Sequence, residues 1–344
     1  MKKQDQPITR RRFLAGTARS AGVIAVTAGV MEVAARQAGA ASLGKEPNPF
    51  ALDTERLRKT DPKLIRYEQA AKFPCPAPDS RRLALGPDDG VYIPAGNVLM
   101  VLDRAGTKLQ QIDCSAPVRC VAVAPDRTIY AGVGDHVEVF DSKCKRIATW
   151  DAPAKKAWIS GLALSESNVF AADSGSRLVL RYDKSGKVVG RIGEKNKDRG
   201  VPGIILPSPY LDVKLARDGL LRINNTGRHR VEAYTVDGDF EFAWGKPSGA
   251  IDGFCGCCNP VGLALLPDGR YVTCEKGLPR VKVYSPEGAF ECVVAGVESF
   301  PENWRKCSLV DCTVGGVDAA VDSQQRIYIL DRVTNDVRIM KRKA

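Results

Sequence analysis

The sequence predicts an all-β protein folded as a six-bladed β-propeller. A unit of four short strands separated by polar turns recurs along most of the chain, and helical periodicity is absent after the first 40 residues. Equivalent positions in successive units lie 38 to 56 residues apart, near the roughly 40 to 50 residues expected when one four-stranded sheet is one repeat. These equivalent positions are Pro87, Pro125, Glu166, Arg217, Pro267 and Ser323.

Residues 1–40 resemble a twin-arginine export signal. Three consecutive arginines at 10–12 stand directly before Phe13 and Leu14, and a weakly hydrophobic run rich in Ala and Gly follows. Small residues at 38–40 offer a cleavage site. The alternative is an amphipathic N-terminal helix. The resemblance implies that the chain is exported already folded, so we expect the mature protein in the periplasm or elsewhere outside the cytoplasm.

Residues 41–63 are polar and contain prolines, which predicts a linker before a propeller domain at residues 64–344. The first strand is expected within 64–73. The sixth repeat ends after three strands, near Met340, with no fourth. We therefore expect the N-terminal strand to complete the last blade, which closes the ring and hides two strand edges.

Charge and hydropathy exclude two classes of partner. The net charge of +11 comes from 51 basic and 40 acidic residues, and it falls to about +6 without residues 1–40. The remaining basic residues are scattered, unlike those of a nucleic-acid-binding surface. No run beyond residue 40 reaches the roughly 18 apolar residues that a membrane span needs. We therefore expect no nucleic-acid partner and no membrane span after signal removal.

Several strand pairs resemble the NHL repeat. In the segment 169–182 a strand ending at Asp173 precedes a strand with alternating basic residues, and Gly186 stands in the next turn. The resemblance extends over residues 64–340 and implies the propeller fold, but it supplies no mechanism. Four stretches look, more narrowly, like those of a group of exported bacterial NHL propellers: 206–210, 242–247, 255–260 and 275–284.

Three cysteines stand within four residues in the run Phe254-Cys255-Gly256-Cys257-Cys258-Asn259-Pro260, just before an expected inner strand. Connections into inner strands lie at one mouth of a propeller channel, so we expect this loop there. Three thiolates this close can share a soft metal ion or an iron–sulfur cluster, and a fourth sulfur completes a tetrahedral site. The candidate ligands are Cys255, Cys257, Cys258, Cys274, Cys307 and Cys312.

The same cysteines can instead form structural disulfides that hold the long loops together. An exported protein lies in an oxidising compartment, which favours this interpretation. The total of eleven cysteines is odd, so at least one is a thiol, a ligand or linked to another molecule. Both interpretations stay open. Buried thiols or a local disulfide are expected for the scattered Cys75, Cys114, Cys120, Cys144 and Cys292.

Charged residues interrupt two rows of the aligned inner strands. One row holds Arg82, Cys120, Gly161, Asp212, Gly262 and Asp318. The other row consists of the residues two positions later in each repeat, and all of them are alanine except Lys214. Inner strands converge on the axis, so we expect Arg82, Asp212, Lys214 and Asp318 to meet in the channel. Since buried charges persist only when paired or bound, the four predict either a salt-bridge network or a site for a polar ligand or cation.

Common catalytic schemes find little support in the sequence. The two histidines, His136 and His229, belong to different repeats, which removes the usual histidine-based acid–base schemes. There is no Gly-x-Ser-x-Gly motif and no glycine-rich phosphate loop. Residues that end second strands, such as Asp173 and Glu275, are expected to cap turns. Lactonase-like propellers instead use an acidic residue and asparagines near the axis to hold a divalent cation.

The leading hypothesis is a periplasmic binding or redox-accessory protein. Its cysteine loop would either hold a metal ion or an iron–sulfur cluster or form a reactive disulfide. A protein partner or a small ligand would bind to this loop at the channel mouth. One alternative is a cation-dependent hydrolase or lyase of the lactonase-like kind, with Asp212, Asp318 and asparagine as ligands. Another is a protein–protein interaction scaffold with structural disulfides. The fold alone does not choose among them.

Overall fold

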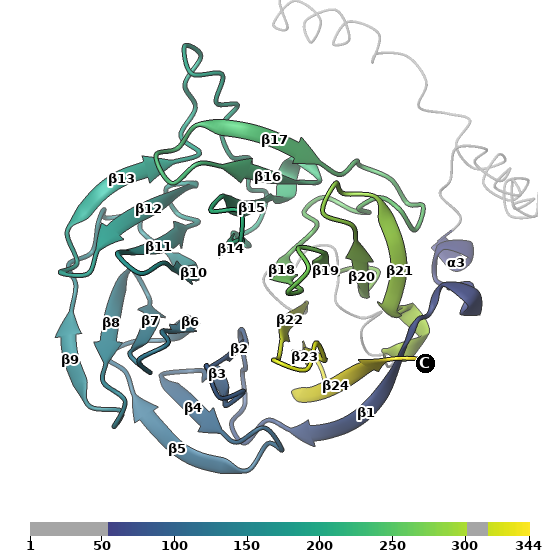
Figure 1. Ribbon diagram of the computed structural model, residues 1–344, viewed down its shortest axis with the longest axis horizontal. Coiled ribbons are helices and arrows are strands. Elements are labelled where there is room, and N and C mark those ends of the chain that lie inside the picture. Colours follow the sequence, from purple (N-terminus) through teal and green to yellow (C-terminus); the bar gives the residue numbers. More distant parts are fainter. Residues whose placement is uncertain (1–53, 301–315) are drawn as a thin grey trace, which may run out of the picture. The chain divides into compact units, whose positions relative to one another are not determined.

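Six four-stranded antiparallel sheets surround a central axis in the computed structural model, which describes residues 54–300 and 316–344 (Figure 1). The first strand of each repeat lies next to the axis and the later strands follow outwards. The domain is therefore a six-bladed β-propeller, as the repeat spacing predicts. The predicted signal at 1–40, most of the predicted linker, and Cys307 and Cys312 lie outside the described residues.

The first three blades each follow the chain without interruption. Blade 1 consists of β2 (Ala84–Leu85), β3 (Val91–Ala95), β4 (Val98–Leu102) and β5 (Lys108–Asp113). Blade 2 consists of β6 (Val118–Val123), β7 (Ile129–Val133), β8 (His136–Phe140) and β9 (Arg146–Thr149). Blade 3 consists of β10 (Ile159–Leu164), β11 (Asn168–Asp173), β12 (Leu178–Asp183) and β13 (Val188–Ile192).

The next two blades have the same order, with longer connections between them. Blade 4 consists of β14 (Val213–Leu215), β15 (Leu221–Asn225), β16 (Arg230–Tyr234) and β17 (Phe240–Trp244), with η2 (Thr226–Arg228) between β15 and β16. Blade 5 consists of β18 (Gly262–Leu265), β19 (Tyr271–Glu275), β20 (Arg280–Tyr284) and β21 (Phe290–Ala295), followed by η3 (Val297–Ser299).

Blade 6 joins the two ends of the domain. Its inner strands are β22 (Val317–Val321), β23 (Ile327–Asp331) and β24 (Asp336–Arg342), and its outer strand is β1 (Tyr67–Pro74), which pairs antiparallel with β24. The register runs from Tyr67 opposite Arg342 to Pro74 opposite Asp336. Two short helical segments precede β1, α3 (Thr54–Leu57) and η1 (Pro62–Leu64).

A repeated aromatic–glycine contact joins the outer edge of one blade to the next blade. Trp150 follows β9 and lies against Gly186 of blade 3, and Trp244 at the end of β17 lies against Gly288 of blade 5. A Cβ on either glycine would stand within 2.4 Å of the indole, and both glycines have positive φ, so other residues fit poorly. Phe73 of β1 makes the same contact with Gly106 of blade 1.

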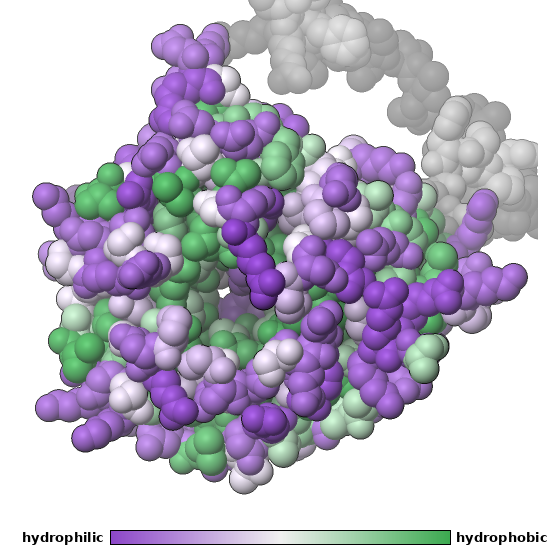
Figure 2. Space-filling view, viewed as in Figure 1, coloured by the Kyte–Doolittle hydropathy of each residue, from purple (hydrophilic) through white to green (hydrophobic). Residues whose placement is uncertain are grey.

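The channel has two mouths that differ in composition. At the N-terminal mouth, where the six inner strands begin, the connections from the preceding blades and the turns after second strands come together. At the C-terminal mouth, the ends of the inner strands surround an opening lined mainly by Leu, Val and Ala. Figure 2 shows a narrow opening at the centre of the ring of blades. Among the described helices, none has the length and apolar character to cross a membrane.

The contact of Phe73 with Gly106 predicts that β1 contributes strongly to stability. We expect Phe73→Ala to lower the free energy of unfolding by about 3 kcal/mol, since it empties a buried aromatic site between the last blade and the first. Leu109→Ala is the control, because Leu109 is 61% exposed on β5. Urea unfolding followed by circular dichroism measures both. Equal stability of the two variants would contradict this role for β1.

Candidate functional site

The four predicted channel residues meet in one network. The Arg82 guanidinium lies 2.8 Å from an oxygen of Asp318 and 3.3 Å from an oxygen of Asp212. Lys214 Nζ lies 3.0 Å from the other oxygen of Asp212. The structure thus brings together residues of blades 1, 4 and 6 that are as many as 236 positions apart in the sequence. The charges are paired with one another, which is the salt-bridge alternative of the sequence analysis.

Both carboxylates also accept hydrogen bonds from the backbone of the following blade. Leu263 N of blade 5 donates to Asp212 at 3.1 Å, and Leu83 N, at the entry to the inner strand of blade 1, donates to Asp318 at 2.9 Å. Buried charges are tolerated only with this kind of compensation. Burial raises the pKa of Asp212, but Lys214 and Arg82 outweigh it, so its pKa lies below the ordinary value. Burial lowers the pKa of Arg82, and the two aspartates more than reverse this.

The cysteine loop is attached to this network at Pro260. Asn224, buried on β15, accepts a hydrogen bond from Asp212 N and donates one to Pro260 O at 2.9 Å. Asn259 stabilises the loop from within, since its amide donates to Cys255 O at 2.5 Å and to Lys276 O at 3.0 Å. The loop therefore sits at the N-terminal mouth, between the start of β18 and the turn after β19.

A buried ion cluster supports the outer side of the same loop. Glu275 forms ion pairs with Arg280 and with Lys282, each at 2.8 Å. Its carboxylate also accepts a hydrogen bond from Cys255 N at 3.3 Å. Lys282 Nζ also donates to the carbonyl oxygens of Ile251 and Gly253. Burial lowers the pKa of Lys282 to about 8, against the opposing effect of Glu275. Glu275 thus acts as an anchor for the loop, beyond the turn cap that its position in the repeat predicts.

Cys257 and Cys258 form an adjacent pair of unlike thiols. Their sulfur atoms lie 3.3 Å apart, with Cys257 exposed and Cys258 buried. Burial raises the pKa of Cys258, but the nearby Ser208 hydroxyl, the Cys257 thiol and the charge of Lys276 together lower it below the ordinary value. The Ser208 hydroxyl is buried without a hydrogen bond of regular geometry to any described group, so it can turn towards the sulfur when Cys258 ionises.

The remaining predicted ligands do not join this pair in the described part of the chain. Cys255 is half-buried and is placed by its backbone contacts to Glu275 and Asn259. Cys274 is buried on β19 opposite Gly262, and burial, reinforced by Asp318, raises its pKa well above the ordinary value. Within residues 54–300 and 316–344, no three or more His, Cys, Asp or Glu side chains are grouped to hold a metal ion. No disulfide joins any two of the nine cysteines described.

No role was predicted from the sequence for Ser208 or Lys276. Lys276 follows β19, and its Nζ lies 4.7 Å from the centre of the Tyr210 ring. Ser208 and Tyr210 belong to the connection before β14, one blade away from the cysteines. One feature of the sequence could have indicated these residues. They lie in segments 206–210 and 275–284, which are two of the four stretches with the narrower NHL resemblance.

Comparisons with known proteins agree with the fold. No protein-family model matches the sequence, and no curated protein matches it. A streptogramin B lyase structure is similar over 80% of this chain and 98% of its own, with a TM-score of 0.56 and 11% identity. A catalytically inactive virginiamycin B lyase from Staphylococcus aureus with quinupristin is similar over 78% of this chain and 82% of its own, with a TM-score of 0.53 and 12% identity. At such identity the likeness concerns the fold alone.

The lowered pKa of Asp212 predicts a dependence of stability on acid. A carboxyl group whose folded pKa lies below its unfolded value of about 3.9 stabilises the fold above that pH, and the contribution is lost as the pH falls through the folded pKa. Lys214→Met removes one cause of the lowering, so we expect acid unfolding to begin at a higher pH. Circular dichroism against pH measures this. The exposed Lys108→Met on β5 should leave the midpoint unchanged, and an equal shift in both variants would refute the prediction.

The contact with Lys276 predicts the ionisation of Cys258. In Lys276→Gln the pKa of the Cys258 thiol should rise, because a stabilising positive charge is lost. The pH dependence of Cys258 modification by a small thiol reagent, followed by peptide mass spectrometry, measures the shift. Lys143→Gln, an exposed site on blade 2, is the control. An unchanged pH profile in Lys276→Gln would show that Lys276 does not act on this thiol.

Proposed function

We propose that this protein is an exported binding or redox-accessory propeller of the NHL type, whose Cys257–Cys258 pair exchanges disulfides with a partner at the N-terminal mouth. The observation that carries the proposal is an exposed thiol 3.3 Å from a buried thiol of lowered pKa. The twin-arginine-like residues 1–40 support export to a compartment where disulfide exchange operates.

The adjacency of the two cysteines favours a reactive disulfide over a structural one. Consecutive Cα atoms lie roughly 3.8 Å apart across a trans peptide, below the usual range of roughly 4.4–6.8 Å between disulfide-bonded residues. A disulfide between neighbours is therefore strained. Strained and exposed disulfides are the ones that thiols reduce most readily. A structural disulfide that holds two long loops together would instead join cysteines far apart in the sequence.

The exposure and pKa of the two sulfurs assign their roles in the exchange. A partner thiolate attacks the exposed Cys257 Sγ of the oxidised pair. A mixed disulfide forms, the Cys257–Cys258 bond breaks, and Cys258 leaves as a thiolate, which its lowered pKa assists. A second partner thiolate then attacks its own mixed disulfide and releases Cys257, and both cysteines end as thiols once protons are taken up. The partner gains a disulfide, and a partner disulfide reverses the sequence.

The geometry supports this proposal better than the enzyme alternative. Both of the solved structures compared above are described as lyases, which favours a lyase by analogy only. The carboxylates that a channel cation would need are Asp212 and Asp318, and Arg82, Lys214 and backbone N–H groups already bind them. A cation would have to compete with these partners.

Glutathione exchange tests the proposal. Reduced protein is incubated with oxidised glutathione and digested without reductant, and the peptides are identified by mass spectrometry. We expect the wild type to form the Cys257–Cys258 disulfide. Cys258→Ser should accumulate glutathione on Cys257, since the resolving sulfur is gone. Cys257→Ser should accumulate much less, because Cys258 is buried.

The half-buried Cys144 of blade 2 provides the control, and Cys144→Ser should behave as the wild type. Equal glutathione incorporation in Cys257→Ser and Cys258→Ser would contradict the assigned roles. A wild type that retains a stable mixed disulfide on Cys257 would contradict the exchange itself. Metal analysis of the same preparation distinguishes the metal or iron–sulfur alternative, in which these thiols would be protected from glutathione.

A further inference from the structure

A second feature of the N-terminal mouth is a cavity of about 480 Å³ beside the cysteine loop. This volume is in the range of small-molecule sites. Tyr210 links the cavity to the loop, because its ring lies on the cavity wall and next to Lys276. The wall is formed by Arg81, Arg82, Arg119, Lys156, Trp158, Ser160, Ser174, Gly175, Pro209, Tyr210 and Arg332.

The charge of this wall has one sign. Five of the lining residues are Arg or Lys, and none is Asp or Glu. Arg82 is balanced by the channel aspartates, and Arg81 forms an ion pair with Asp79 on the surface. Arg119 and Lys156 have no carboxylate within ion-pair distance in the described chain. The wall therefore carries positive charge that the surrounding protein leaves unbalanced.

Arg119 shows the imbalance most directly. The central carbon of its guanidinium lies over the Trp158 ring, 3.4 Å from the ring centre, and its buried Nε has no hydrogen-bond partner among the described groups. Burial lowers the pKa of Arg119, and the like charge of Arg81 lowers it further. A buried guanidinium donor without an acceptor costs free energy that an anionic ligand would recover.

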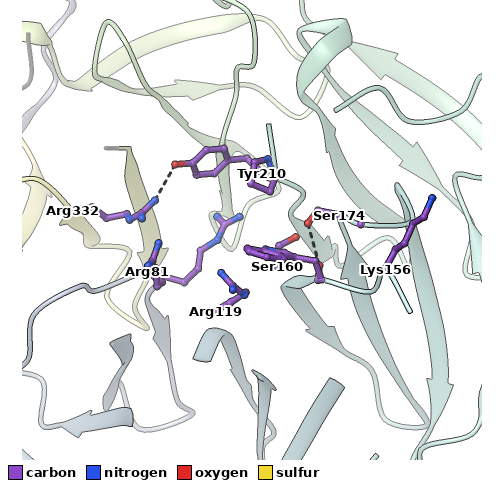
Figure 3. A pocket seen from close by; sticks show the side chains of 11 residues that line it. Arg81, Arg119, Lys156, Ser160, Ser174, Tyr210 and Arg332 are labelled. Atoms are coloured by element: carbon purple, nitrogen blue, oxygen red, sulfur yellow. Dashed lines mark hydrogen bonds between the residues drawn. The ribbon is translucent and has the colours of Figure 1, made fainter. Parts of the chain in front are cut away.

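The other polar groups of the cavity are held in place by the blades. Arg332 donates to the Tyr210 hydroxyl at 3.0 Å and to Ser80 O at 3.1 Å, and Ser174 donates to Trp158 O at 3.1 Å. Figure 3 shows Arg81, Arg119 and Arg332 on one side, with Ser160 and Ser174 across from them and the Tyr210 hydroxyl next to Arg332. They come from blades 1, 2, 3, 4 and 6, so a small ligand would meet a preformed site.

We propose that this cavity binds a small molecule that carries two or more carboxylate or phosphate groups. Arginine presents paired N–H donors in the fork that matches these oxyanions. Arg119 and Lys156, the two cavity cations without a carboxylate partner among the described residues, favour a ligand with two anionic groups over a single carboxylate. The volume of the cavity favours a small molecule over a macromolecule. The proposal does not depend on the chemistry of Cys257 and Cys258.

Calorimetric titration with citrate and with pyrophosphate tests the proposal and distinguishes carboxylate from phosphate ligands. We expect saturable binding of at least one of them at constant ionic strength, and about tenfold weaker binding in Arg119→Gln. Arg127→Gln is the matched control. Arg127 follows the other end of the same strand, β6, is exposed, and lies outside the cavity, so its loss should leave affinity unchanged.

Three results would overturn the proposal. The first is no saturable binding of either anion. The second is equal weakening in Arg119→Gln and Arg127→Gln, which would indicate a general effect of net charge. The third is binding of acetate as tight as that of citrate, which would show that the site does not select multiple charges. Unchanged anion binding in the Cys257→Ser/Cys258→Ser double variant would support the independence of this cavity from disulfide exchange, and loss of binding there would refute it.

Discussion

The network of Arg82, Asp212 and Asp318 is the constraint on which the rest of this domain depends. Each aspartate accepts a backbone hydrogen bond from the next blade, and the guanidinium joins both aspartates across the channel. Neighbouring blades also meet through apolar side chains, which are strong in sum but weakly directional. The buried charges, which are costly unless all their partners are in place, fix how the inner strands are arranged around the axis.

The two glycines in the same row of the repeat alignment follow from this network. A Cβ on Gly161 would lie 2.9 Å from a carboxylate oxygen of Asp212, and a Cβ on Gly262 would lie 2.8 Å from one of Asp318. Each aspartate thus occupies the space that a side chain on the preceding inner strand would fill. The alternation of glycine and aspartate in this row therefore has one cause, which is that each aspartate packs against the glycine of the preceding blade.

The repeat pattern was sufficient to predict the blades and the meeting of the channel residues, because both depend on periodic positions. The wall of the anion cavity was not predicted. Arg119 lies on an inner strand, Arg332 in a turn after a second strand, and Lys156 in a connection. They share no repeat position, so only the closed ring places them around one space. The sequence also predicted Cys274 as a partner of the cysteine loop, but its place on β19 directs it to Gly262 and the channel aspartates.

The pairing of β1 with β24 has a consequence for synthesis of the chain. β1 leaves the ribosome before any blade, whereas its partner β24 follows blades 1 to 5 in the chain, so both backbone edges of β1 stay bare while those blades are synthesised. Bare edges recruit wrong partners. Only two of its eight residues are buried in the finished domain, and Glu68, Lys72 and Pro74 are among its exposed positions. These charges and the terminal proline make the waiting segment a poor template for aggregation.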